Sequence, residues 1–166
     1  MATLRKARQQ DLAELTALLR LLFTIDEDFS FNEAKQRQGL LLMLDNDRGC
    51  ILVAEEAGRI IGMCTGQVVI STAEGGPAVL VEDMVVAPAH RGQGTGRALM
   101  NTMAGWALEQ GATRIQLLAD KYNPPALAFY QRLGWQTTAL ICLRHHLSLG
   151  NQATNNITKT RQWRHP

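Results

Sequence analysis

The sequence lacks the charge imbalance and the long apolar runs that mark two large classes of protein. Its 17 lysines and arginines stand against 15 aspartates and glutamates, a net charge of +2, with no long basic runs interleaved with aromatic residues, which excludes a nucleic-acid partner. No apolar run approaches the ~18 residues of a membrane span, and the first residues, MATLRKARQQD, contain no apolar segment of the kind a signal peptide needs. We therefore expect a cytoplasmic protein without a membrane partner.

Cysteine is also scarce. Cys50, Cys64 and Cys142 are widely spaced and odd in number, so they form neither a disulfide framework nor a zinc-ligand pattern. Small buried thiols in a reducing compartment account for them. His145 and His146 are adjacent on an expected strand and cannot easily share one metal ion. No metal site is expected.

The apolar pattern predicts one α/β domain built on a mixed sheet. A length of 166 residues suits a single core, and the element order reads β-α-α-β-β-β-α-β-α-β, with one more strand if the last segment divides. The expected strands are 3–8, 50–56, 59–70, 78–87, 113–119 and one or two within 135–147; the helices are 12–23, 33–44, one ending near 110, and one following Asn123. Asp11, Asn32 and Asn123 are the expected N-caps.

The domain is expected to span residues 1–148, followed by a polar tail at 149–166. Trp163 is a lone aromatic residue on that polar arm, which suits docking on the domain itself or on a partner subunit. We therefore expect a homodimer.

The stretch PAHRGQGTGRALM, residues 88–100, holds three glycines in five positions directly before an expected helix. Backbone amides at a helix start bind phosphate, and glycine lets the phosphate approach them. A P-loop is excluded because Gly96 is followed by Arg97 and Ala98 instead of Lys and Ser or Thr. A dinucleotide fingerprint is excluded because its third glycine position holds Arg97 or Leu99, depending on the register.

The segment Arg91–Gly96 fits the pattern Arg/Gln-x-x-Gly-x-Gly/Ala, and it follows the strand end VVAP and precedes Asn123 and ALAFYQRLGW. Across residues 82–135 the chain resembles the GCN5-related N-acetyltransferase (GNAT) family, which binds acetyl-coenzyme A. The resemblance implies a centrally splayed sheet and transfer of an acetyl group to a primary amine by direct attack.

By this resemblance, the backbone of Met84, Val85 and Val86 pairs with the pantetheine arm, and Asn123 reaches that arm or the leaving sulfur. Tyr130 donates a proton to the departing thiolate; its alternative is a half-buried aromatic on a packed helix face. The pyrophosphate is bound by the loop, at Arg91, Gly92, Gln93, Gly94, Thr95, Gly96 and Arg97.

The base is expected at Glu82 or Asp83. Neighbouring strand residues face opposite sides of a sheet, so only one of the two should look into the cleft. VEDMVVAPAHRGQGTG resembles in particular the spermidine/spermine acetyltransferase branch, where the first acid of the pair is the proposed base. We therefore favour Glu82 as the catalytic base and assign Asp83 to acceptor binding.

The segment LLFTIDEDFSF, residues 21–31, occupies the position that roofs the acceptor pocket in the family. Phe23 and Phe29 with Asp26 and Asp28 would suit a small cationic amine; the alternative is a solvated acidic turn. Two further functions stay open: a protein or peptide N-acetyltransferase, and a non-catalytic sensor that only binds acyl-coenzyme A.

Overall fold

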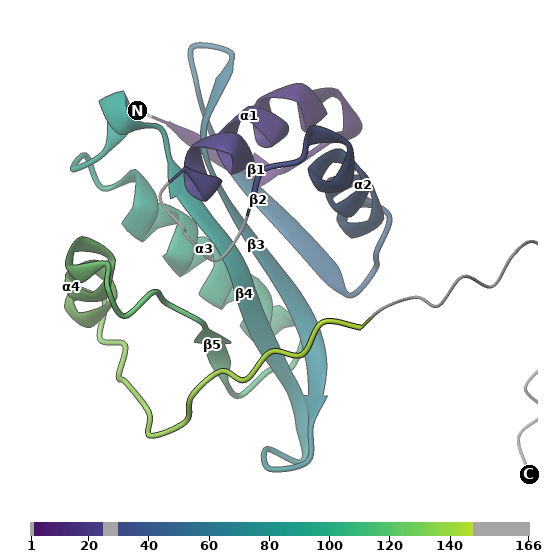
Figure 1. Cartoon of the computed structure of the whole chain (residues 1–166), viewed down its shortest axis with the longest axis vertical. Coiled ribbons are helices and arrows are strands. Elements are labelled where there is room, and N and C mark those ends of the chain that lie inside the picture. The colour runs from purple at the N-terminus through teal and green to yellow at the C-terminus, as the bar shows by residue number, and fades with distance from the viewer. Residues whose placement is uncertain (1, 25–29, 148–166) are drawn as a thin grey trace, which may run out of the picture.

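The computed structural model describes residues 2–24 and 30–147. Four helices and five strands make up the described part of the chain (Figure 1). The strands are β1 (Thr3–Lys6), β2 (Gly49–Glu56), β3 (Arg59–Ser71), β4 (Gly76–Val86) and β5 (Ile115–Leu117). The helices are α1 (Leu12–Phe23), α2 (Glu33–Leu44), α3 (Thr95–Glu109) and α4 (Pro124–Arg132). The predicted α/β fold on a mixed sheet is confirmed.

The strands lie in the order β1-β2-β3-β4-β5. The first four are antiparallel to their neighbours, whereas β5 is parallel to β4. Helices α1 and α2 cover one face of the sheet, and α3 and α4 lie on the other (Figure 1). This is a three-layer arrangement in which each face of the sheet has its own apolar core.

Alternation along β2 explains the two cores. Ile51 and Val53 point to the leucines of α1 and α2, whereas Cys50, Leu52 and Ala54 point to α3. Successive strand side chains face opposite sides, so a strand buried on both faces is apolar at every position. The run CILVA in β2 meets that requirement.

The expected final strand is absent from the part of the chain that the structure describes. Residues 135–147 are irregular, and Leu140, Ile141 and Leu143 are more than three-quarters exposed. A strand exists only through a partner ladder, and β5, the edge strand nearest in sequence, has only three residues. The strand predicted within 135–147 from its apolar pattern is therefore wrong.

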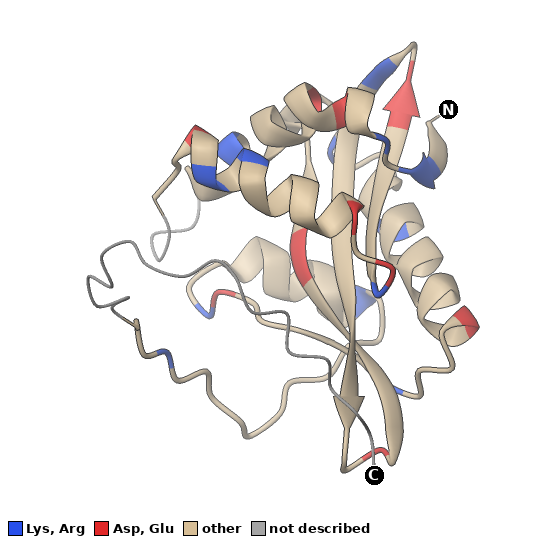
Figure 2. Cartoon of the chain, turned by 90° about the vertical axis from the view of Figure 1, so that its right-hand side faces the viewer, with Lys and Arg blue, Asp and Glu red and all other residues tan. Residues whose placement is uncertain are grey.

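No helix among residues 2–24 and 30–147 is long and apolar enough to cross a membrane. In Figure 2 the ribbon segments of Lys and Arg (blue) and of Asp and Glu (red) are scattered over several elements and do not gather on one of them. The domain boundary expected at 148 and the tail at 149–166 lie outside the described residues.

Candidate active site

Strands β4 and β5 pair over three residues only. Val79, Leu80 and Val81 are matched with Ile115, Gln116 and Leu117, and β4 then continues to Val86 without β5 beside it. On its other edge β4 stays paired with β3 as far as Val86 and Gly62. The edge from Glu82 to Val86 is therefore unpaired toward β5, which leaves main-chain groups for an extended ligand.

A β-bulge lies where this free edge begins. Val81 is opposite Gly66 and Met84 is opposite Cys64, so Glu82 and Asp83 together face the single residue Thr65. A bulge of two residues against one interrupts the alternation of side chains. Glu82 and Asp83 both line the same cavity, and the prediction that only one of them looks into the cleft is wrong for this reason.

Thr65 holds the bulge in place. Its hydroxyl accepts a hydrogen bond from the Asp83 backbone N–H at 2.9 Å and donates one to Asp83 Oδ2 at 3.0 Å. Thr65 is fully buried and Asp83 is half-buried. One hydroxyl thus satisfies the backbone group that the bulge would leave unpaired and orients the carboxylate beside it.

The surroundings of Asp83 raise its pKa to about 6. Burial is the largest cause, because it disfavours the charged form, and the neighbouring charge of Glu82 adds to it. The hydrogen bond from Thr65 acts in the opposite direction. A carboxyl with a pKa near 6 is largely ionised at neutral pH yet binds a proton far more readily than an exposed aspartate.

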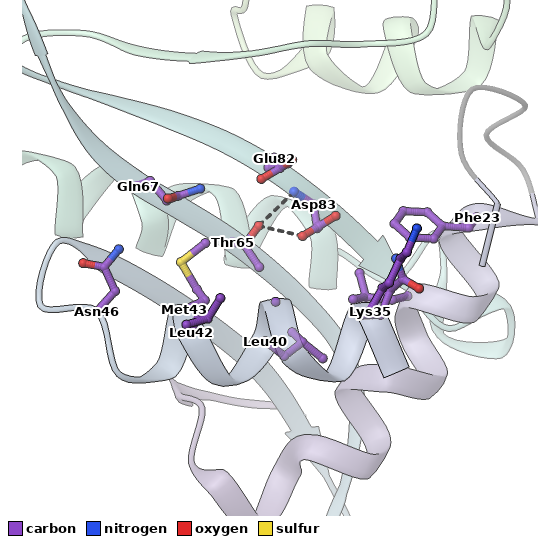
Figure 3. A pocket seen from close by; sticks show the side chains of 13 residues that line it. Phe23, Lys35, Leu40, Leu42, Met43, Asn46, Thr65, Gln67, Glu82 and Asp83 are labelled. Carbon is purple, nitrogen blue, oxygen red and sulfur yellow. Dashed lines mark hydrogen bonds between the residues drawn. The ribbon is translucent and has the colours of Figure 1, made fainter. Parts of the chain in front are cut away.

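The cavity beside the acids has a volume of about 340 Å³, at the small end of the range for ligand pockets. In Figure 3, Phe23 and Lys35 lie at one end of the cavity and Asn46 and Gln67 at the other, with Thr65, Glu82 and Asp83 between them. Its lining comes from α1, from α2 and the turn after it, and from the middle of β3 and β4: Leu19, Phe23, Lys35, Gln36, Gly39, Leu40, Leu42, Met43, Asn46, Thr65, Gln67, Glu82 and Asp83.

The glycine loop has the geometry that anion binding requires. Gly92 and Gly94 take positive φ values of 73° and 87°, and a Cβ at either position would meet nothing within 4 Å. The first intrahelical bond of α3 runs from Ala98 N–H to the carbonyl of Gly94, so the amides of residues 95–97 have no intrahelical partner. These open amides at a helix start fit a pyrophosphate.

Two side chains of the loop are used within the protein. Arg91 Nε donates to the carbonyl of Val86 at 2.8 Å, and Gln93 Nε2 donates to the carbonyl of Ala89 at 3.1 Å. The first bond ties the loop to the end of β4, and the second ties it to the 3-10 turn Pro88–His90. Gly96 faces inward, since a Cβ there would lie 3.1 Å from the Met84 side chain and 3.2 Å from Phe129. Glycine at this position therefore lets α3 approach β4 and α4 closely.

Asn123 and Tyr130 lie at the two ends of α4. The Asn123 side-chain oxygen accepts from Ala126 N–H at 3.2 Å, which makes it the predicted N-cap and leaves only its NH₂ group for a ligand. The Tyr130 ring packs against Phe129 and Trp135. Burial raises the pKa of Tyr130 to about 12, with a smaller contribution from Cys64. The phenol therefore stays protonated at neutral pH.

The sequence reasoning missed the helix wall of the cavity. Phe23 lines the cavity as expected, whereas Asp26, Asp28 and Phe29 lie outside the described residues. The contribution of α2 had one signal in the sequence: Gly39, a residue that costs stability inside a helix. Nothing lies within 4 Å of its missing Cβ, so packing does not require it, and it leaves space in the cavity.

The sequence matches the family model described as "Acetyltransferase (GNAT) family" over residues 12–135. It is 38% identical over 74 residues to the streptothricin acetyltransferase of Streptomyces lavendulae, a match that covers 45% of this chain and 39% of that protein. It is 28% identical over 141 residues to the L-2,4-diaminobutyric acid acetyltransferase of Nocardia farcinica, covering 82% of this chain and 68% of that one.

The fold is also that of a solved acetyltransferase. A structure of aminoglycoside N-acetyltransferase AAC(6')-Iy in complex with CoA superposes with a TM-score of 0.78 at 17% identity, covering 88% of this chain and 95% of that one. At this identity the likeness concerns the fold alone. The match to the streptothricin enzyme spans only about two-fifths of that protein.

Proposed function

The chain belongs to the acetyltransferase (GNAT) family, and from this premise we propose that it transfers an acetyl group from acetyl-coenzyme A to a primary amine of a small molecule. The observation that carries the proposal is the bulge of β4, which places two carboxylates in a small cavity at the start of an unpaired strand edge. That edge leads directly into the glycine loop. Acceptor and acyl donor would thus meet at one point of β4.

Acetyl-coenzyme A supplies the acyl group as a thioester. The amides of residues 95–97 and the open space over Gly92 and Gly94 fit its pyrophosphate. The free edge at Met84, Val85 and Val86 fits its pantetheine arm as an added strand, and main-chain N–H groups there can stabilise negative charge on the acyl oxygen. The Asn123 NH₂ group would contact the arm near the sulfur.

Asp83 is the base that the geometry supports best. An ammonium ion must lose a proton before its nitrogen can attack the acyl carbon, and a carboxylate with a pKa near 6 in the cavity can accept that proton. Glu82, the residue favoured from the sequence, is exposed and raises the pKa of Asp83 through its charge. In this proposal Glu82 attracts the ammonium ion and Asp83 deprotonates it.

Tyr130 would act on the leaving sulfur. As the nitrogen–carbon bond forms and the carbon–sulfur bond breaks, negative charge collects on sulfur, and the phenol of Tyr130 would donate a hydrogen bond to it. A pKa near 12 makes complete proton transfer to a thiolate unfavourable, because thiols have a pKa near 8.5. We therefore assign Tyr130 to stabilisation of the thiolate, which takes a proton from the medium, while the nitrogen of the new amide releases its second proton there.

The names of the relatives support an amine acceptor. They are acetyltransferases named for streptothricin, for diaminobutyric acid and for aminoglycosides. The size of the cavity favours a small molecule over the alternative of a protein or peptide acceptor. A half-buried carboxylate oriented by Thr65 favours a catalytic protein over a sensor that only binds acyl-coenzyme A. The cytoplasmic location and the homodimer expected from the sequence remain proposals.

Two measurements on the whole chain test this function. Release of free thiol from acetyl-coenzyme A should depend on an added amine. Calorimetry should show that Gly94→Glu abolishes binding of acetyl-coenzyme A, because the new side chain enters the pyrophosphate path. Gly75→Glu is the matched control: Gly75 also has positive φ and open space, but it lies in the turn between β3 and β4.

Equal loss of affinity in both glycine variants would attribute the effect to backbone strain. Unchanged affinity in Gly94→Glu would contradict the cofactor site. A circular dichroism spectrum of each variant separates loss of binding from loss of fold.

A further inference from the structure

The cavity has a cation at one end, and this bears on the chemical class of the acceptor. Lys35 is the one positively charged residue among the described residues that line it, and the acids Glu82 and Asp83 line it as well. Figure 3 shows Lys35 beside Phe23, at the end away from Asn46 and Gln67. A ligand in this cavity therefore meets negative charge in the middle and positive charge at one end.

Lys35 forms no ion pair with an acidic residue in the described part of the chain. No salt bridge within 4.0 Å joins it to any residue in the described ranges 2–24 and 30–147. Arg20, on the adjacent helix α1, is engaged with Glu33 at 2.9 Å and lies 4.7 Å from the centre of the Phe31 ring. Of these two cations, Lys35 is the one left to meet a ligand.

The separation of Lys35 from the acid pair suits a ligand with two opposite charges. If Lys35 served only to neutralise Glu82 and Asp83, it would form an ion pair with one of them, and among the described residues it does not. A purely cationic acceptor would place like charge beside Lys35 whenever its second ammonium reached that end. A carboxylate at that end would be attracted instead.

Helix α2 leaves room for such a ligand. Gly39 lies one turn after Lys35 on the same face, about 6 Å along the helix axis, and lines the cavity. A Cβ there would meet no atom within 4 Å, so packing does not account for a glycine that weakens the helix. Its missing side chain keeps a path open between Lys35 and the acids.

We propose that the acceptor is an amino acid-like molecule, with a primary amine that binds at Glu82 and Asp83 and a carboxylate that binds Lys35. The inference rests on the proposed acetyl transfer and names its substrate class. It differs from the purely cationic amine expected from segment 21–31, which stays a prediction because Asp26 and Asp28 lie outside the described residues. The present inference rests on Lys35, which lines the cavity.

The test uses pairs of acceptors that differ only by a carboxylate: 4-aminobutyrate and propylamine, ornithine and putrescine, lysine and cadaverine. At saturating acetyl-coenzyme A, we expect kcat/KM to favour the amino acid in at least one pair by about tenfold. Lys35→Gln should reduce that preference about two- to fivefold, the range for an exposed charged contact. Lys35→Glu should reverse it.

Arg37→Gln is the matched control, because Arg37 is exposed on the same helix and does not line the cavity; it should leave the preference unchanged. Thermal shift by each pair member without acetyl-coenzyme A provides a second measurement, independent of turnover. Equal use of both members of every pair, or a preference that Lys35→Gln leaves intact, overturns this inference while the proposed acetyl transfer stands. No thiol release and no thermal shift with any amine overturns both.

Discussion

At the scale of single residues, Asp83 determines the expected pH dependence. Its carboxyl must be ionised to accept a proton, and its pKa near 6 lies above the ordinary value of 3.8. Thus kcat/KM should rise as the pH increases through about 6, with a further rise at higher pH as the free amine forms. Asp83→Asn should lower kcat/KM on the order of 10²-fold and remove the rise near pH 6.

Glu82→Gln provides the contrasting variant. The charge of Glu82 raises the pKa of Asp83, so its removal should move the rise to lower pH without abolishing it. A pH profile that keeps its rise in Asp83→Asn and loses it in Glu82→Gln would assign the base to Glu82, as the sequence had favoured.

Tyr130→Phe removes one hydroxyl and keeps the ring packed against Phe129 and Trp135. We expect kcat to fall on the order of 10²-fold, the usual scale for removing a hydrogen-bond donor to developing charge, while the affinity for acetyl-coenzyme A and the melting temperature stay unchanged. Stopped-flow or steady-state thiol release measures kcat, calorimetry measures the affinity, and thermal unfolding measures the melting temperature. A kcat within about threefold of the wild type would reduce Tyr130 to a packing residue.

At the scale of elements, the bulge between β3 and β4 depends on Thr65. Thr65→Val leaves Asp83 N–H without its bond, which should cost about 1–3 kcal/mol of the free energy of unfolding. It also removes the hydrogen bond that lowers the pKa of Asp83. The rise in kcat/KM should therefore move to higher pH, and Thr65→Ser should restore both properties. Denaturant unfolding and a pH profile measure them; loss of stability without a change in the profile would make Thr65 purely structural.

Local chemistry made several elements predictable from the sequence. Asn32 and Asn123 cap α2 and α4 as expected, because a side-chain oxygen before a helix bonds to its own first turn. Asp11 occupies the expected N-cap position of α1, but its side chain makes no capping hydrogen bond there. Its carboxylate instead forms an ion pair with Arg5 and accepts from Arg8 N–H at 2.7 Å. The ion pair with Arg5 of β1 is stronger than a capping bond to a neutral backbone N–H.

The bulge could not be predicted, because it is a property of two strands. Glu82 and Asp83 line the same cavity because Val81 is matched with Gly66 and Met84 with Cys64. The residue pattern of β4 alone does not predict that register. The same reason explains the missing last strand: alternation within 135–147 predicts a strand, but the ladder that would create it requires a partner. The expectation that only one of the two acids faces the cavity was wrong, since both line it; the roles assigned to the site residues stay predictions.

At the scale of the whole molecule, the two proposed catalytic groups lie on opposite faces of the sheet. The cavity with Asp83 lies on the side of α1 and α2, whereas Tyr130 packs against the core on the side of α3 and α4. These groups can act on one reacting centre only where no paired strand separates them. The edge of β4 beyond Val81 is such a place, so the short pairing with β5 is the feature that would let the proposed base and the proposed thiolate donor act on one substrate.

The expected homodimer is a property of the whole molecule as well. Leu140, Ile141 and Leu143 are 80–86% exposed, and exposed apolar side chains gathered in one segment suit a surface that another chain covers. We predict that a second copy covers it and that the protein sediments as a dimer. Leu143→Asp should shift it to monomer across a concentration series, whereas Leu108→Asp, at a residue 73% exposed on α3, should leave the dimer intact. Sedimentation of the wild type as a monomer, or an equal response of the two variants, would assign the exposed segment no role in assembly.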